Sequence, residues 1–377
     1  MMQPVSYQDA PADLDVRQHN FSAGPGSLPR EVVDEVRDEL PVYPGLGASI
    51  MEVSHRSPAY TEIHTRAGAR VKSLLGMGED WHVLFLQGGA SMQFHQLALN
   101  FIPEGGTVDY LDTGVWSTKA IQEAEIVARG RSARVNVAAS GRASDYTAIP
   151  DASSWRLSDD AAYLHYTSNN TIYGSQFASE PQVAAPLVCD ASSDFLSRPL
   201  DVDRYGLIYA GAQKNIGPAG VTAVLVRDDL LQTRAPDLPT MLDYGTHAAK
   251  LFNTPPVFAI YIVDKVLAWI ERNGGLAGMV ERNAAKADRL YGALDGSEFY
   301  RPTVARDSRS SMNVCFRLPS EDLDARFVAE AKAAGLLALK GHRSVGGVRA
   351  SIYNALSLQD VEALVDFMDA FESRKPQ

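Results

Sequence analysis

The sequence has few cysteines, no excess of positive charge and no long apolar run, and each of these absences excludes a class of protein. None of its apolar runs approaches the roughly 18 uninterrupted residues that a membrane helix needs, so we expect no membrane-spanning segment. Lys and Arg number 35 against 46 Asp and Glu, which gives a net charge of -11 with no separate basic segment. Because this charge repels the phosphate backbone of nucleic acids, we expect no nucleic-acid partner.

The only two cysteines, Cys189 and Cys315, each lie within an apolar stretch that predicts a strand. Two separated thiols make neither a disulfide framework nor a metal cluster, so we expect no metal site and a reducing compartment. Residues 1–19 lack both the apolar core of a secretion signal and the Arg-rich pattern of an organelle-targeting segment. We therefore expect a disordered leader over these residues and a cytoplasmic location.

The length and the order of apolar patterns predict two domains. A chain of 377 residues exceeds the size at which one core usually stops growing. Short apolar runs at 83–86, 108–111, 162–166, 187–189, 207–210 and 221–226 alternate with helical patterns, which indicates an α/β fold with a mainly parallel sheet. A helix over 258–270 ends at the stop signal Asn273-Gly274-Gly275.

Beyond that stop signal the pattern predicts a smaller α+β domain. Helices are expected over 276–294, 323–334 and 358–371, with a strand over 312–318. We therefore place a large domain at 20–272, whose first residues should pack with the small one, and the small domain at 273–377.

One lysine stands out by its neighbours. Lys214 follows the apolar run at 207–210, with Gly211 and Ala212 before it and a Gly/Pro-rich turn after it. Small neighbours leave room for a planar ligand, and a lysine with restricted solvation has the lowered pKa that Schiff-base chemistry needs. The alternative is a surface lysine at the start of a loop, which does not require this crowding of small residues.

An acid lies 24 positions upstream. Asp190 ends the run at 187–189, and ligands of parallel sheets bind at the carboxyl ends of the strands, so Asp190 and Lys214 are expected to meet in one crevice. A carboxylate there can keep the pyridine nitrogen of pyridoxal phosphate protonated. An N-cap for the next helix is an equally good interpretation of Asp190 alone.

Two further segments predict cofactor contacts, each with an ordinary alternative. Gly88-Gly89, followed by Ala90 and Ser91, comes after a strand and opens a helix, where backbone amides can bind a phosphate. Taken alone, two glycines after a strand more often form a tight turn. Trp116 follows the run at 108–111 and can stack on a cofactor ring, or can be a core tryptophan.

Loop residues and basic clusters complete the candidates. Thr171 and the pair Asn253-Thr254 are donors in loops, and alone they indicate only turns. Two clusters are basic, the first with His55 and Arg56 and the second with His342, Arg343 and Arg349. In an acidic protein such clusters suit a dianionic small molecule, because arginine matches carboxylate and phosphate geometry. Solvated surface charge is the alternative.

Several of these segments together resemble one known family. The segment Tyr-Ala-Gly-Ala-Gln-Lys-Asn-Ile-Gly-Pro-Ala-Gly at 209–220 is similar to the cofactor-attachment motif of class V aminotransferases. Four other segments are similar to motifs of the members that act on O-phospho-L-serine, in the same order, and the resemblance extends from Asn20 onward. These segments are residues 20–25, 51–56, 252–256 and 341–354.

The resemblance implies a fold-type I pyridoxal-phosphate enzyme with a mainly parallel seven-stranded sheet, acting as a homodimer with shared active sites. It makes Lys214 the Schiff-base lysine and Asp190 the partner of the pyridinium nitrogen. The other implied cofactor contacts are Trp116 against the ring, Thr171 near its oxygen, Ala90, Ser91 and Gln213 at the phosphate, and Asn253 and Thr254 reaching across from the other subunit. The implied substrate contacts are Arg349 at the α-carboxylate and His55, Arg56, His342 and Arg343 around the distal anionic group.

Ser91 departs from the pattern of some members, which carry an arginine at this position. Without that charge, Arg56, His342 and Arg343 have to neutralise most of the substrate phosphate.

The expected reaction is a ping-pong amino transfer that converts O-phospho-L-serine and 2-oxoglutarate into 3-phosphooxypyruvate and L-glutamate, a step of serine biosynthesis. 4-Phosphohydroxy-L-threonine, an intermediate of pyridoxine biosynthesis, is a possible second substrate. One alternative is a class V aminotransferase for small amino acids such as alanine with glyoxylate. The other is a non-catalytic anion-binding protein, which has no use for Lys214, Asp190 and Trp116 together.

Overall fold

A seven-stranded sheet forms the centre of the computed structural model, which describes residues 17–374. Its strands are arranged in the order β2-β10-β9-β8-β5-β3-β4. β10 alone runs in the opposite direction to the other six strands of this sheet. The strands are β2 (Trp81–Leu86), β3 (Thr107–Asp112), β4 (Arg134–Ser140), β5 (Ala161–Thr167), β8 (Leu187–Asp190), β9 (Tyr205–Gly211) and β10 (Thr222–Arg227).

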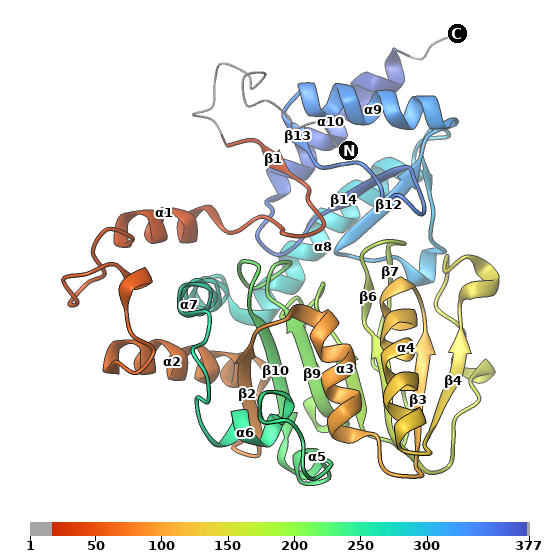
Figure 1. Ribbon diagram of the computed structural model, residues 1–377. Helices are drawn as coiled ribbons and strands as arrows, with labels where there is room; N and C mark the ends of the chain where they lie inside the picture. Colours follow the sequence, from red (N-terminus) through yellow and green to blue (C-terminus); the bar gives the residue numbers. More distant parts are fainter. Residues whose placement is uncertain (1–16, 375–377) are drawn as a thin grey trace, which may run out of the picture.

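Alternating side chains on these strands bury both faces of the sheet. In β9, for example, Leu207 and Tyr209 belong to one core and Ile208 and Ala210 to the other. Helices α3 and α4 cover the first face, and α2 and α7 cover the second (Figure 1). This is the layered arrangement expected when strands are buried on both sides.

The helices of this part differ in how they begin. Ser57 caps α2 by accepting a hydrogen bond from the Tyr60 amide, whereas Gly88 opens α3 in the left-handed region with φ of 97°. The helices are α1 (Arg30–Glu39), α2 (Pro58–Leu75), α3 (Gly89–Phe101), α4 (Val115–Gly130), α5 (Asp228–Gln232), α6 (Tyr244–Ala249) and α7 (Val257–Arg272). The two short strands β6 (Asn169–Asn170) and β7 (Ser175–Gln176) pair with each other.

A smaller α+β unit with its own core lies at one end of the sheet (Figure 1). Its elements are α8 (Gly275–Asp295), β11 (Arg301–Pro302), β12 (Asn313–Arg317), α9 (Glu321–Ala333), β13 (Leu336–Leu337), β14 (Val348–Ser351) and α10 (Leu358–Ser373). The beginning of the described chain joins this unit, because β1 (His19–Asn20) pairs with β13 and Phe21 is buried in its core.

The α/β class and the mainly parallel seven-stranded sheet are confirmed. Among the strands of four or more residues, two were missed. β4 is mostly half-buried or exposed, so it shows no continuous apolar run, and β14 has only four residues within a Gly- and Arg-rich segment. Residues 1–16 of the predicted leader lie outside the described residues. Within residues 17–374, no helix is both long and apolar enough to cross a membrane.

Candidate active site

The strand register brings three loops to the same edge of the sheet. Thr222 of β10 pairs with Gly211 on one side and with Leu86 on the other, so the loops after β9 and β2 start side by side. Asp190, the last residue of β8, pairs with Tyr209 of β9. The predicted convergence of Asp190, Lys214 and the glycine-rich start of α3 on one edge therefore follows from the pairing of the strands.

Lys214 is held against aromatic and hydroxyl groups. Its Nζ lies 3.4 Å from Oγ1 of Thr171 and 5.6 Å from the centre of the Trp116 ring. Burial lowers the pKa of Lys214; the Asp190 carboxylate opposes this effect and the Arg349 guanidinium adds to it. A lowered pKa makes the neutral, nucleophilic amine available nearer to neutral pH than in a free lysine.

An N-terminal segment, which the sequence did not single out in this role, packs directly on Lys214. The amide of Gly26 donates a 2.7 Å hydrogen bond to the Gln213 carbonyl, and a Cβ at Gly26 would lie only 2.8 Å from the Lys214 carbonyl oxygen. A Cβ at Gly24 would lie 3.5 Å from Cγ of Lys214. The glycines in the segment 20–25 and just after it thus allow two stretches of backbone to approach closely.

Asp190 is a buried acid, only 4% exposed, and its Oδ1 accepts a 3.0 Å hydrogen bond from the Ser192 amide. Burial raises the pKa of Asp190, while Lys214 and Ser192 act in the opposite direction. A buried carboxylate is costly unless it is paired, so its position beside a lysine is typical of a functional site.

Trp116, Thr171 and Arg349 form a connected chain. The indole Nε1 of Trp116 donates to Oγ1 of Thr171 at 3.0 Å, and Nη1 of Arg349 donates to the Thr171 carbonyl at 3.1 Å. The Nε atom of Arg349 is buried and has no partner among the described residues. Because buried donors are rarely left unpaired, this one fits a site completed by an anionic ligand.

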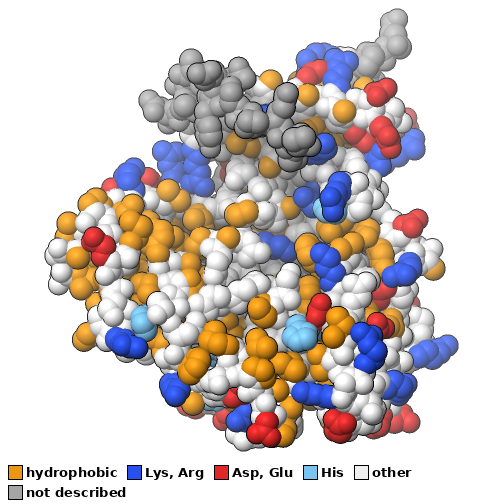
Figure 2. Space-filling view, in the orientation of Figure 1, with side chains coloured by type: hydrophobic (Ala, Val, Ile, Leu, Met, Phe, Trp, Pro, Cys, Tyr) orange, Lys and Arg blue, Asp and Glu red, His pale blue; other side chains and the backbone are white. Residues whose placement is uncertain are grey.

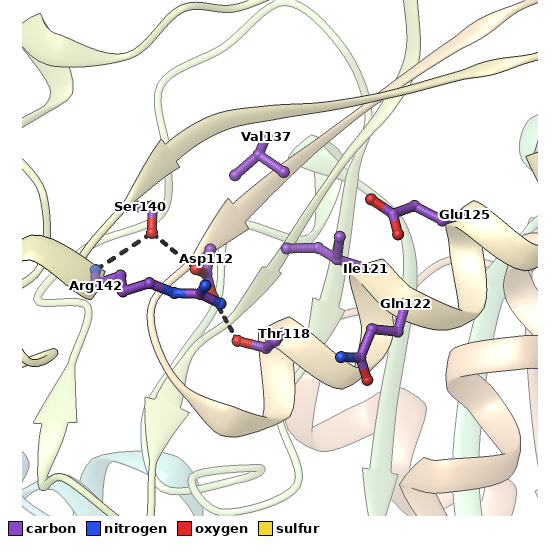
Figure 3. Close-up of a pocket in the computed structure, with 8 residues that line it drawn as sticks. All are labelled: Asp112, Thr118, Ile121, Gln122, Glu125, Val137, Ser140 and Arg142. Atoms are coloured by element: carbon purple, nitrogen blue, oxygen red, sulfur yellow. Dashed lines mark hydrogen bonds between the residues drawn. The ribbon is translucent and has the colours of Figure 1, made fainter.

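The Asp112 carboxylate holds the start of α4, the helix that carries Trp116, through hydrogen bonds. It accepts hydrogen bonds from Thr118 at 2.8 Å, Ser140 at 2.7 Å and Tyr146 at 3.1 Å. Figure 3 shows Asp112 between Thr118 of α4 and Ser140 of β4, in a hollow on the side of α4 that faces β4. These bonds hold the first turn of α4 and so the position of the Trp116 ring.

The predicted phosphate contacts gather at the start of α3. Gly88 and Gly89 both have positive φ, at 97° and 66°, and they lead into the first turn, which contains Ala90 and Ser91. Free amides at a helix start bind anions. Gln87 links this loop to another segment, since it donates to the Thr254 carbonyl at 3.0 Å and accepts from Asn253 at 3.3 Å. The Gln213 side chain lies over Gly211.

The two basic clusters are placed differently. Arg349 contacts Thr171, and the pKa of His342 is lowered by burial and then by the charges of Arg349, Arg343 and Lys119. His55 and Arg56 lie just before α2, and the exposed Arg56 lines a separate hollow with α2 residues. No contact joins them to Lys214 within residues 17–374.

Lys119, at 4.9 Å from the Trp116 ring, was missed because one lysine on a helix carries no signal in the sequence.

These side chains fit pyridoxal phosphate. The site combines a lysine of lowered pKa, a buried acid, an indole face and a helix start for a phosphate. The model of the class-V aminotransferase family matches residues 18–364, and the chain belongs to this family. It is therefore a pyridoxal-phosphate-dependent aminotransferase of the expected fold.

Relatives within the family define the group more closely. A phosphoserine aminotransferase of Azotobacter vinelandii is 53% identical over 359 residues, which are 94% of this chain and 98% of the relative. The solved structure of the phosphoserine aminotransferase from Bacillus circulans subsp. alkalophilus is 50% identical, with a TM-score of 0.91 over 95% of this chain and 99% of that chain. A pyridoxal-phosphate-bound phosphoserine aminotransferase from Trichomonas vaginalis is 40% identical, with a TM-score of 0.90 over 94% and 100%. The chain thus groups with the phosphoserine aminotransferases.

Proposed function

We propose that the chain transfers an amino group between O-phospho-L-serine and 2-oxoglutarate, giving 3-phosphooxypyruvate and L-glutamate for serine biosynthesis. The observation that carries the proposal is the arrangement of Lys214, Asp190 and Trp116 beside the cationic groups of Arg349 and Arg343. The first three suit amino-group chemistry, and the last two suit a substrate with two anionic ends.

When it is bound, pyridoxal phosphate supplies an electron sink for the charge that develops at the substrate Cα. Lys214 holds the cofactor covalently between turnovers. With the cofactor bound, the free Lys214 amine would act as the base for the proton at the substrate Cα and, once protonated, as the acid that returns it. The Asp190 carboxylate keeps the ring nitrogen protonated.

The other assignments concern binding of the cofactor. Trp116 would hold the cofactor ring through its indole face, and Thr171, which already contacts both Lys214 and Trp116, would bond near the ring oxygen. The phosphate is held by the amides and hydroxyl of the Ala90-Ser91 turn and by Gln213. Asn253 and Thr254 of the partner subunit complete this phosphate site.

The substrate is held at its two ends. Arg349 receives the α-carboxylate, which gives its unpaired Nε a partner. His342 and Arg343 face the distal phosphate, together with His55 and Arg56 of the partner subunit. Figure 2 shows basic side chains around the middle of the face between α3 and α4 and the C-terminal unit.

The proposal extends to a homodimer, a two-domain division and a cytoplasmic location. Exposed apolar side chains on one flank support the dimer: Val42 is 55% exposed, Met51 59%, Leu251 43% and Phe252 40%. Figure 2 shows apolar side chains gathered over the α1 and α2 region of this flank. Separate cores support two domains, and the change from one core to the other falls within α8, between Met279 and Ala287, a few residues after the proposed division at 272/273. The free, buried thiols of Cys189 and Cys315 suit the cytoplasm.

A comparison of amino donors tests the substrate. With 2-oxoglutarate as acceptor, we expect kcat/KM for O-phospho-L-serine to exceed that for L-alanine by at least roughly 10³-fold, because alanine leaves the cationic groups unpaired. The measurement is a coupled assay of glutamate formation, with 4-phosphohydroxy-L-threonine as a third donor. A preference for alanine with glyoxylate would overturn the proposal in favour of the other class V reaction.

Co-expression of two inactive variants tests whether the active sites are shared. Lys214→Ala and Arg56→Ala, carrying different tags, are expected to be nearly inactive as homodimers. In the heterodimer, one site combines Lys214 of one subunit with the partner subunit's Arg56, so about half of the wild-type activity per dimer is expected. A single double variant, with both changes in the same chain and paired with wild type, provides the control, because each of its two sites then lacks either Lys214 or the partner subunit's Arg56. A heterodimer as inactive as its parents would show that Arg56 acts within its own chain.

A further inference from the structure

Two of the groups assigned so far to the distal phosphate carry a permanent charge, Arg343 and Arg56 of the partner subunit, and only Arg343 belongs to this side of the site. A phosphomonoester carries a charge of about -1.5 to -2 near neutral pH. Ser91 brings no charge, and Arg349 is committed to the α-carboxylate. His342 is held toward its neutral form, since burial and its cationic neighbours lower its pKa. A further permanent cation on this side of the site would therefore improve binding.

Lys119 is such a cation, and its position is fixed by the fold. It lies one helical turn after Trp116 on α4, so both side chains project from the same face of the helix. The start of α4 is anchored by the bonds of Thr118 and Ser117 to Asp112. The Nζ of Lys119 is 4.9 Å from the centre of the Trp116 ring, over which the Nζ of Lys214 also lies, at 5.6 Å.

The positive charge of Lys119 is also available to bind an anionic ligand. Its side chain is exposed and forms no ion pair with a carboxylate in residues 17–374, whereas the neighbouring acid Glu123 is paired with His95. The charges of three cationic side chains lower the pKa of His342: Lys119 of α4, Arg349 of β14 and Arg343 of the loop before β14. Like charges brought together without an acid are unfavourable unless an anionic ligand joins them.

We propose that Lys119 is a specificity-determining residue that binds the distal phosphate of the substrate, opposite His342 and Arg343, and supplies the charge that Ser91 lacks. This inference rests on the proposed function. It assigns a role to a residue outside the sequence motifs, beside the Trp116 ring.

The test compares Lys119→Gln and Lys119→Arg with the wild-type holoenzyme. In Lys119→Gln we expect KM for O-phospho-L-serine to rise roughly tenfold, with kcat changed less than twofold, because a charged hydrogen bond to the bound phosphate is lost. Lys119→Arg should restore most of the affinity. The rate with L-alanine, which has no phosphate, should stay unchanged. Lys332→Gln, an exposed lysine on α9, is the matched control and should behave as wild type.

A second measurement does not depend on turnover. Inorganic phosphate should inhibit the wild type competitively against O-phospho-L-serine, with an inhibition constant that rises in Lys119→Gln by about the same factor as KM. An unchanged KM and inhibition constant would overturn the inference, as would an equal loss with O-phospho-L-serine and L-alanine, which indicates a structural role. Failure of the proposed function itself is distinguished because the wild type would then not use O-phospho-L-serine.

Discussion

Lys214→Ala is expected to lower kcat by at least roughly 10³-fold, because one amine both holds the cofactor and carries the Cα proton. The loss should not reflect unfolding. Lys214 lies at a partly buried site where burial lowers its pKa, so removing the amine removes no strong ion pair from the folded protein. The purified variant should also lack the visible absorbance of lysine-bound pyridoxal phosphate, while the phosphate site still binds the cofactor non-covalently.

Two comparisons separate the chemical role of Lys214 from a structural one. Lys214→Arg keeps the positive charge but stays protonated, so it should be as inactive as Lys214→Ala. A small primary amine added to Lys214→Ala should recover part of the proton-transfer rate, and the recovery should increase with pH as more of the free amine is neutral. Retained turnover together with the visible absorbance in Lys214→Ala would contradict the assignment.

The site could be predicted where its residues adjoin strands with a clear apolar pattern. β8 and β9 are buried along their whole length, so their ends, and with them Asp190 and the turn leading to Lys214, were located within one or two residues. Parallel pairing then brings the two ends together without further information. The small C-terminal elements α8, α9 and α10 were likewise predicted closely, because their apolar spacing is helical.

Residues that depend on tertiary contacts could not be found in this way. Arg349 was a candidate because it belongs to a basic cluster, but it lies on a short strand preceded by glycines, so only its contact with Thr171 places it beside the other site residues. The role of Gly26 depends on backbone packing against Lys214, across a separation of many residues. Lys119 is one charge on an amphipathic helix, and its meaning comes from the Trp116 ring and His342. The periodicity of apolar residues in the sequence does not reveal any of these tertiary contacts.

Asp190→Asn is expected to lower kcat by roughly 10²–10³-fold while leaving the fold intact. The amide has the same shape and can keep the 3.0 Å bond from the Ser192 amide, but it has no negative charge to hold a proton on the ring nitrogen. The free energy of unfolding of the cofactor-free protein, unlike kcat, should not fall and is expected to rise. The folded-state pKa of Asp190 is raised by burial, so the ionised form is disfavoured by folding and the resulting cost appears as the pH rises above its usual pKa.

At neutral pH the cofactor-free Asp190→Asn protein should therefore unfold at the same temperature as the wild type or a higher one, despite its low activity. Thermal unfolding of both proteins at pH 5 and pH 8, before and after cofactor loading, provides the measurement. The gain in unfolding temperature should be larger at pH 8, where more of the wild-type carboxylate is ionised, and cofactor loading should reduce it, because the ring then gives that charge a partner. If cofactor-free Asp190→Asn unfolds at a lower temperature than the wild type, Asp190 supports the fold through Lys214. If Asp190→Asn keeps wild-type activity, Asp190 has no role in the mechanism.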